Sequence, residues 1–418
     1  MALLVQKYGG TSVANIEHIE HVAQRIINTK NEGYDVVVVV SAMGGETDRL
    51  IRLAEDLHDN PHPRELAALL ATGEQVSVAL LCMALHKHGF KARSYTGWQA
   101  GIITDDSFKK ARIQKVQTET ISEALNEGNI VVVAGFQGVD SNGNITTLGR
   151  GGSDTTAVAL AAALNAHECQ IYTDVEGVFT ADPRIVSEAK LLKHITFEEM
   201  LELASLGAKV LQIRAVEFAG KFQIPLRVAS TFSDCPGTLV TYEEKIKGKV
   251  MEQPKVSGIA FNRNEARLTL LGVPDRLGIA GIILGPVSEA NVDVDMIIQN
   301  DSADGTIDFT FTVNREDFNK ANEILKKLAT ELDARDVVTD NKIAKISLVG
   351  VGMRSHPGIA TKMFTTLGNE GIGIKMISTS EIKISVVIDE KYTELGVRAL
   401  HAAFRLEQGP TEEFDPEG

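Results

Sequence analysis

The chain has 418 residues, of which 42 are Lys or Arg and 56 are Asp or Glu, so its formal charge is −14 at pH 7. Because single hydrophobic cores rarely grow past ~250–300 residues, this length predicts two or three domains. A hydrophobic share of 44% with 23% charged residues excludes a disordered chain. The excess of negative charge argues against nucleic acid or an anionic membrane as the main partner, since both attract basic surfaces.

Residues 1–240 alternate strand-like and helix-like segments. The strand-like segments are short apolar runs: Leu3–Gln6, Val36–Val40, Ile130–Ala134 and Gln170–Thr173. The helix-like segments lie between and after them: Glu17–Thr29, Leu66–Leu85, Thr155–Asn165 and Phe197–Ala204. This alternation predicts an α/β domain with a parallel or mostly parallel sheet and helices on both faces.

The composition changes after residue 240, and an internal repeat follows. Residues 241–256 are charged and lack long apolar periodicity, so we expect a linker there. Gly278-Ile279-Ala280 recurs as Gly358-Ile359-Ala360, and Met296-Ile297 recurs as Met376-Ile377, both 80 residues later.

Each copy of the repeat reads as strand, glycine loop, helix, two strands and a second helix. With a closing strand that the sequence does not place, this is a βαββαβ, ferredoxin-like unit. We therefore expect two such domains, at 257–335 and 342–406, followed by an acidic tail at 407–418 that is solvated.

The cysteines and the apolar runs indicate the cellular compartment of the protein. Cys82, Cys169 and Cys235 form an odd, widely spaced set, which is typical of neither a disulfide framework nor a zinc site. We expect buried thiols in a reducing cytoplasm. The longest apolar runs, Val78–Leu85 and Ala157–Leu164, fall short of the ~20 residues of a membrane-spanning helix, so we expect no membrane contact.

Two glycine loops carry the strongest chemical signal. Lys7-Tyr8-Gly9-Gly10-Thr11-Ser12 follows the first strand, and Gly149-Arg150-Gly151-Gly152-Ser153-Asp154 opens an Ala-rich helix. Glycines let backbone N–H groups approach an anion, and a helix N-terminus adds the positive end of its dipole. Lys7 precedes its glycines, so the first loop is not a Walker A motif. Each loop alone could be a plain strand-to-helix turn. In the second loop, Ser153 or Asp154 could be the helix cap.

Further loops leave the predicted strands on the same side. Ser41–Thr47 follows the five valines, and Thr173–Arg184 follows the strand at 170–173. In an open parallel sheet, ligands bind at the carboxyl ends of the strands, where these loops would meet. Glu74 is a carboxylate on a mostly apolar helix, and it could also be an ordinary surface acid.

These motifs together resemble the aspartokinases of the amino-acid kinase superfamily. The resemblance lies in Lys7–Ser12, Gly149–Asp154, Thr173-Asp174 and Thr180–Arg184. The repeat is similar to a pair of ACT domains, the amino-acid-sensing modules that such kinases carry. The resemblance implies a three-layer α/β kinase domain at 1–240 and two ACT domains. It also implies transfer of the ATP γ-phosphoryl group to the side-chain carboxylate of L-aspartate, giving 4-phospho-L-aspartate on the route to lysine, threonine and methionine.

The resemblance assigns roles to individual residues of the first domain. Lys7 and Asp154 are catalytic, and Mg²⁺ is held mainly by the nucleotide phosphates, with no metal ligands assigned in the chain. The implied aspartate-binding residues are Thr47, Glu74, Arg150, Gly151, Gly152 and Ser153. The implied ATP-binding residues are Lys7, Tyr8, Gly9, Gly10, Ser41, Thr173, Asp174, Phe179, Thr180, Asp182, Pro183, Arg184 and Lys209.

The resemblance also implies inhibition by lysine, threonine or both, and a homo-oligomer formed through the ACT domains. First-copy effector candidates are Asp275, Gly278, Ile279, Ala280, Asn291, Val292, Asp293, Val294 and Gln299. Second-copy candidates are His356, Pro357, Gly358, Ile359, Ala360, Ile374, Lys375, Thr379, Ser380 and Glu381. Some relatives also make the regulatory half as a separate small subunit, and an internal start near Met251 would allow it here.

Other functions remain open at this point. A kinase of the same superfamily could act on glutamate, acetylglutamate or carbamate. A non-catalytic amino-acid-binding regulator would tolerate loss of Lys7, Arg150 and Asp154, all of which are present. A dinucleotide dehydrogenase would need G-x-G-x-x-G after the first strand, which the sequence does not supply.

Overall fold

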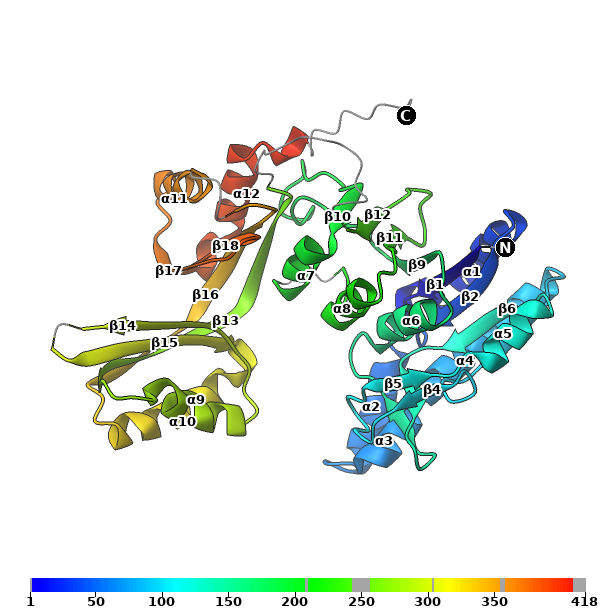
Figure 1. Cartoon of the computed structure of the whole chain (residues 1–418), viewed down its shortest axis with the longest axis horizontal. Helices are drawn as coiled ribbons and strands as arrows, with labels where there is room; N and C mark the ends of the chain where they lie inside the picture. Colours follow the sequence, from blue (N-terminus) through cyan, green and yellow to red (C-terminus); the bar gives the residue numbers. More distant parts are fainter. Residues whose placement is uncertain (1, 207–209, 243–255, 303, 354–357, 409–418) are drawn as a thin grey trace.

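The computed structural model describes residues 2–206, 210–242, 256–302, 304–353 and 358–408 (Figure 1). Residues 2–242 build one α/β body around a sheet of eight strands in the part of the chain that is described, in the order β10-β12-β11-β9-β1-β2-β6-β3. The strands are β1 (Leu3–Tyr8), β2 (Asp35–Val40), β3 (Ala92–Tyr95), β6 (Ile130–Ala134), β9 (Glu168–Thr173), β10 (His194–Thr196), β11 (Leu226–Ser230) and β12 (Thr238–Thr241).

This sheet is mostly parallel, as the sequence predicts. β1 pairs in parallel with β2 and β9, and β6 pairs in parallel with β2 and β3. β12 runs antiparallel to β11 near one edge. The carboxyl ends of β1, β2, β6 and β9 therefore share one edge, where a ligand would bind.

Helices cover both faces of the sheet, which explains the five consecutive valines. Val36, Val38 and Val40 pack in one core cluster with α1 (Ile16–Asn31) and α4 (Thr72–Lys87). Val37 and Val39 pack in the opposite cluster, beneath α5 (Glu119–Asn126), α6 (Gly152–Ala163), α7 (Phe197–Ser205) and α8 (Ile213–Lys221). Successive strand side chains point to opposite faces, so a strand that is covered twice must be apolar throughout.

Two features of this body differ from the sequence expectation. The helix expected at Leu66–Leu85 consists of α3 (Pro63–Leu70) and α4, separated at Ala71, after α2 (Glu46–Leu57). A small second sheet, in the order β5-β4-β7-β8, was not anticipated. Its strands have only three or four residues, too few to show an alternating pattern: β4 (Ile102–Thr104), β5 (Ile113–Val116), β7 (Gln137–Val139) and β8 (Ile145–Thr147).

The expectation that no segment could cross a membrane by length is wrong for one stretch. Pro63–Lys87 covers 25 residues, and its most apolar 18-residue window has a mean hydropathy of 1.7 and is half buried inside the protein. α4 packs on α1 and on the sheet through Val78, Leu81 and Leu85. This is the pattern of a core helix.

Residues 256–408 form a second body around a sheet of six strands among the described residues, in the order β14-β15-β13-β16-β18-β17. Its strands are β13 (Gly258–Pro274), β14 (Val294–Asp301), β15 (Thr306–Asn314), β16 (Asp336–Val349), β17 (Ile374–Thr379) and β18 (Lys383–Asp389). The helices are α9 (Ile279–Glu289), α10 (Phe318–Glu331), α11 (Ile359–Asn369) and α12 (Thr393–Ala403). Figure 1 shows β13 and β16 as long strands that run through both copies of the repeat.

The closing strand of the second copy, which the sequence did not place, is the first part of β13. Gly258–Asn262, at the start of β13, pairs with Lys345–Val349 of β16. The later part of β13 pairs with β15 and with the first part of β16. The second copy is thus closed by residues that precede the first copy. The domain limits 257–335 and 342–406 stay predictions, and residues 243–255 of the expected linker and 409–418 of the tail lie outside the described residues.

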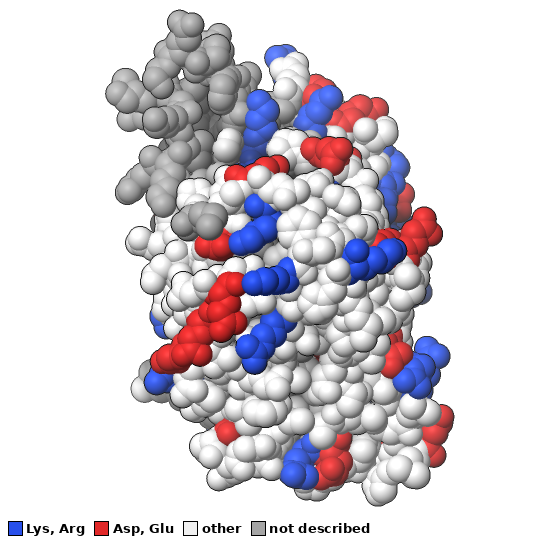
Figure 2. Space-filling model, turned by 90° about the vertical axis from the view of Figure 1, so that its right-hand side faces the viewer, with Lys and Arg blue, Asp and Glu red and all other residues white. Residues whose placement is uncertain are grey.

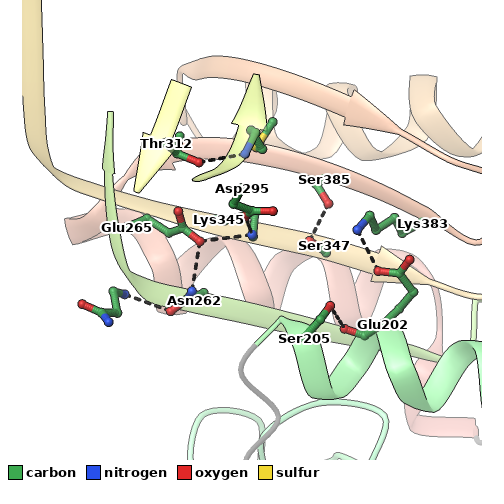
Figure 3. A network of polar contacts seen from close by, with 12 residues as sticks. Glu202, Ser205, Asn262, Glu265, Asp295, Thr312, Lys345, Ser347, Lys383 and Ser385 are labelled. Atoms are coloured by element: carbon green, nitrogen blue, oxygen red, sulfur yellow. Dashed lines mark hydrogen bonds and ion pairs between the residues drawn. The ribbon is translucent and has the colours of Figure 1, made fainter. Parts of the chain in front are cut away.

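Polar and apolar contacts join the two bodies. Lys383 of β18 pairs with Glu202 of α7 at 2.7 Å (Figure 3). Ala260 and Val349 of the second sheet belong to the same hydrophobic cluster as Met200 of α7. One end of β13 and one end of β16 therefore pack on α7. A displacement of α7 would change its contacts with both strands.

Candidate active site

A cavity of about 360 Å³ lies at the carboxyl ends of β1, β2 and β6. Both glycine loops of the sequence meet there, together with the loop after the five valines. Its lining residues are Lys7, Gly10, Ser41, Ala42, Met43, Gly44, Gly45, Thr47, Asp48, Glu74, Phe136, Gly149, Arg150, Gly151, Gly152, Ser153, Asp154 and Gln212. Both expected catalytic residues and all six expected aspartate-binding residues are in this set.

An ion pair marks the centre of the cavity. Lys7 lies near the end of β1, and Asp154 lies in the first turn of α6. Lys7 Nζ is 2.6 Å from Asp154 Oδ1, and the two side chains are 11% and 10% exposed. Few lysines are this buried without a partner, because removing a charge from water is costly. Asp154 therefore fixes the position of the Lys7 ammonium in the lining of the cavity.

Close packing requires glycine at several points in and next to the cavity wall. A Cβ on Gly10 would lie 2.9 Å from the carbonyl oxygen of Ala42, and one on Gly135 would lie 2.7 Å from Ser153 Cβ. Gly151 has φ +70°, and a Cβ there would lie 1.8 Å from Gln212 Cγ. These contacts bring backbone from three loops within reach of one ligand.

The cavity is built to receive anions in spite of the negative net charge. The helices α2 and α6 both begin at its wall, where their free N–H groups and dipoles favour negative charge. Arg150 is exposed beside them and offers a planar fork of donors. In Figure 2, basic and acidic side chains are interspersed over the face drawn. Anion binding thus depends on these local groups.

Glu74 places a buried carboxyl group in the lining of the same cavity. Its residue is 3% exposed, and Oε1 accepts a hydrogen bond from the Ala42 N–H at 3.1 Å. Oε2 is buried and has no hydrogen-bond partner among the described residues. Burial raises the pKa of Glu74 to about 8, against the opposing effect of backbone hydrogen bonds. An unsatisfied buried oxygen of this kind calls for a donor, such as an ammonium group, from a ligand.

The loop expected to hold nucleotide starts at the end of β9, none of its residues lines the cavity, and its residues differ in exposure. Thr173 ends β9 next to β1, and its hydroxyl donates to Asp174 Oδ1 at 2.9 Å. Asp182 pairs with Arg184 at 2.7 Å, and Arg184 is 85% exposed. Thr180 is buried, so its side chain faces protein. Pro183 is exposed, Phe179 is half-buried, and Lys209 lies outside the described residues.

The effector candidates occupy equivalent places in the two copies. Gly278 caps α9 with φ +82°, and Gly358 caps α11 with φ +109°. The side chains of Ile279, Val292 and Ile359 lie in the hydrophobic cores, so that only their backbone could reach an effector. Lys375 is held by Asp340 and Asp389, each at 2.5 Å. His356 and Pro357 lie outside the described residues.

Comparison with known proteins identifies the family. Residues 2–230 match the model of the amino acid kinase family, and residues 267–330 and 346–404 each match an ACT domain model. The chain is 61% identical to the aspartate kinase of Stutzerimonas stutzeri over 407 residues, which are 97% of this chain and 98% of that protein. It is 62% identical to the aspartokinase of Pseudomonas aeruginosa over the same shares of the two chains. The chain belongs to the aspartate kinases.

Solved structures agree with this assignment. Escherichia coli aspartokinase III, in complex with aspartate and ADP in its R-state, is 26% identical, with a TM-score of 0.76 over 96% of this chain and 99% of that one. The same protein with lysine and aspartate in its T-state gives a TM-score of 0.73 over the same shares. The amino-acid kinase fold with two ACT domains, expected from the motifs, is confirmed.

The sequence missed several residues of this aspartate kinase cavity. Phe136 follows Gly135 at the end of β6 and has φ +69°, a left-handed conformation that is rare for a bulky residue. Its position after a central strand was a signal for a cavity residue, because the loops that follow the central strands β1 and β2 also line the cavity. Gln212 precedes α8, far away in sequence, and only the fold brings it to Gly151.

Within the described parts of the chain, no group of three or more His, Cys, Asp or Glu residues could hold a metal ion. Cys82 and Cys169 are buried, as expected, and burial raises the pKa of the Cys82 thiol to about 12. Cys235 lies between β11 and β12 and is half-buried, so the expectation of a buried thiol is wrong for this residue.

Proposed function

We propose that this phosphotransferase moves the γ-phosphoryl group of ATP to the side-chain carboxylate of L-aspartate, giving 4-phospho-L-aspartate. The observation that carries the proposal is the cavity with Lys7–Asp154 at its floor, Arg150 at its rim and Glu74 in its wall. These groups match a ligand with two carboxylates and one ammonium. The names of the relatives and the aspartate and ADP of the Escherichia coli structure support the same reaction.

The roles follow from charge and position. Arg150 grips the α-carboxylate of aspartate, and the buried Glu74 receives its α-ammonium, with Thr47 at the start of α2 helping to orient it. Lys7 neutralises charge on the transferring phosphoryl group, and Asp154 positions Lys7. The acceptor carboxylate is already ionised at neutral pH, so no general base is needed. Catalysis then consists of in-line positioning and charge stabilisation.

Mg²⁺ would be held mainly by the nucleotide phosphates, with Asp154 as the carboxylate at the cavity floor. Magnesium sites of this kind commonly use one or two carboxylates together with phosphate oxygens, which suits a cavity without a dedicated ligand cluster. The ion would neutralise phosphate charge during transfer. Lys7 and the loop amides bind the remaining phosphate oxygens.

The raised pKa of Glu74 predicts proton release when aspartate binds. At pH 7, a group with a pKa of about 8 is mostly protonated, and an incoming ammonium favours its ionised form. We expect close to one proton to leave per aspartate bound at pH 7, and almost none at pH 9. Calorimetric titrations in two buffers with different ionisation enthalpies measure this number.

The same linkage sets the pH dependence of aspartate affinity. Binding that releases a proton strengthens as pH rises, so the Kd of aspartate should fall between pH 6 and pH 8 and then level off. Glu74→Gln is the matched control, since it keeps the shape and cannot release a proton. Proton release that is equal in Glu74→Gln and the unmodified enzyme would contradict the assigned role.

Regulation by end products belongs to the proposal as well. Lysine, threonine or both would bind at the ACT domains, near the glycine-capped starts of α9 and α11, where backbone N–H groups can meet a carboxylate. The Escherichia coli T-state structure contains lysine. We expect millimolar lysine plus threonine to lower aspartate kinase activity. Unchanged activity with both amino acids would refute this part.

The proposal also covers the cellular location, the oligomeric state and the pathway of the enzyme. We infer a cytoplasmic homo-oligomer that assembles through the ACT domains and feeds lysine, threonine and methionine synthesis. A separate regulatory small subunit that starts near Met251 would show as a second, shorter product on expression of the full gene. The rival reading, a kinase for glutamate, acetylglutamate or carbamate, is tested by measuring ADP release from MgATP with each acceptor in turn.

A further inference from the structure

Residues 177–186 form the loop expected to bind nucleotide, called the nucleotide loop below. One side of this loop contacts the second ACT domain. Thr180 Oγ1 lies 3.0 Å from Nε2 of His401, which is on α12. Thr180 is 1% exposed and His401 is 2% exposed. A buried hydrogen bond therefore joins a residue expected to bind nucleotide to the last helix of the regulatory half.

The backbone of the same loop is tied to β13. The Ile259 N–H donates to the Thr180 carbonyl oxygen at 2.8 Å. Gly258 passes so close that a Cβ on it would lie 3.3 Å from that oxygen. The Lys190 N–H donates to Thr180 Oγ1 at 2.9 Å. Thr180 thus has partners from β13, from α12 and from its own segment.

Apolar contacts extend this attachment to the start of α11. Ala181 and Val186 belong to the hydrophobic cluster of the second ACT domain, together with Ile359 and Met363 of α11 and Leu400 of α12. Ile359 follows Gly358 at the expected effector position. One packed core therefore contains the inner side of the nucleotide loop and the helix that would sense an effector.

The opposite side of the loop stays free for a ligand. Asp182 Oδ1 accepts a hydrogen bond from the Arg184 N–H at 2.9 Å, which closes a tight turn. The Arg184 side chain is 85% exposed. The turn is thus rigid at its base and exposed at its tip, an arrangement that positions charged side chains for phosphate.

We propose that Thr180 and His401 are positioning residues for ATP, which set the affinity for nucleotide without touching it. This inference rests on the proposed function, because it assumes that the loop binds ATP. The hydrogen bond holds the loop against the second ACT domain in its binding conformation. Without this bond, part of the free energy of ATP binding is spent on ordering the loop, so the affinity for ATP falls. The aspartate cavity around Lys7 is left intact.

The chemistry of the bond favours a neutral histidine. Burial lowers the pKa of His401 below its ordinary value, although the carboxylates of Glu407 and Glu188 act in the opposite direction. A neutral ring accepts at Nε2 in the tautomer that is protonated at Nδ1, and in that tautomer the Thr180 hydroxyl donates to His401 while it accepts from the Lys190 N–H. The hydroxyl then uses its one donor and one of its two acceptor positions.

The test compares steady-state kinetics of four variants of the full chain. Thr180→Val and His401→Leu remove the bond, whereas Thr180→Ser keeps the hydroxyl and His401→Gln keeps a polar group near Nε2. We expect the first two to raise the KM of ATP roughly three- to tenfold, the worth of one hydrogen bond, with kcat and the KM of aspartate within about twofold. The two conservative variants should recover most of the affinity.

Thr269→Val is the matched control. Its buried hydroxyl bonds to Thr310 at 2.9 Å in the first ACT domain, away from the nucleotide loop, and its loss should leave the KM of ATP unchanged. Equal changes in kcat and both KM values, or an unchanged KM of ATP in Thr180→Val and His401→Leu, would overturn the proposal. If Thr180→Val fails to fold, His401→Leu against His401→Gln decides. Absence of aspartate-dependent ADP release in the unmodified enzyme would instead contradict the proposed function.

Discussion

We expect the Lys7→Ala variant to lose roughly 10²–10³-fold in kcat, or about 2.7–4 kcal/mol of transition-state stabilisation. Lys7 is the buried cation at the carboxyl end of β1, and its ammonium is fixed 2.6 Å from Asp154. Charge that develops on the transferring phosphoryl group has no equivalent partner once the ammonium is removed. Steady-state ADP release with saturating MgATP and aspartate measures the loss.

A control separates this effect from a loss of stability. Lys30→Ala removes another lysine of the same body, whose ammonium pairs with Asp35 at 2.8 Å at the end of α1, far from the loops of the cavity. Its kcat should stay within about twofold. Thermal melting of both variants shows whether the fold persists. A Lys7→Ala enzyme with nearly normal kcat would refute the role of Lys7.

The second large effect concerns Arg150. Arg150→Ala should raise the KM of aspartate roughly 10- to 150-fold, since hydrogen bonds to charged groups contribute about 1.5–3 kcal/mol. Arg150→Lys should recover only part of this loss, because an ammonium cannot form the two parallel hydrogen bonds of a guanidinium with a carboxylate. The KM of ATP should change little in either variant.

An exposed arginine away from the cavity provides the comparison. Arg64 lies on α3, is half exposed and pairs with its neighbour Glu65. Surface pairs of this kind contribute little, so Arg64→Ala should leave the KM of aspartate unchanged. An Arg150→Ala enzyme with the same KM as the Arg64→Ala enzyme would exclude Arg150 from aspartate binding.

The fold and the cavity were predictable where local sequence determines structure. Five valines in a row require a strand that is covered on both faces, and glycine loops after such strands require close backbone approach. Lys7 lies near the end of such a strand, whereas Glu74 lies in the first turn of α4, and Arg150 and Asp154 follow β8 of the small second sheet. The meeting of the loops after β1 and β2 therefore followed from the topology of a parallel sheet, while the full fold brings Glu74, Arg150 and Asp154 to the same place.

The remainder depends on contacts between distant segments. Gln212 reaches the cavity because the start of α8 lies there, which no local pattern specifies, whereas Phe136 closely follows the central strand β6. The start of β13 closes the second ACT domain through pairing with residues almost 90 positions later, such as Ile259 with Leu348. The bond between Thr180 and His401 likewise joins residues 221 positions apart.

The most direct test of the aspartate kinase reaction is the identity of its product. The full-length enzyme with MgATP should form an acyl phosphate on aspartate, trapped by hydroxylamine as aspartyl hydroxamate, in an amount equal to the ADP released. Glutamate, acetylglutamate and carbamate should give at most a few per cent of that rate, and Lys7→Ala should abolish most of it. Hydroxamate formation that is greater with another acceptor, or ADP release without any hydroxamate, would contradict the proposed function.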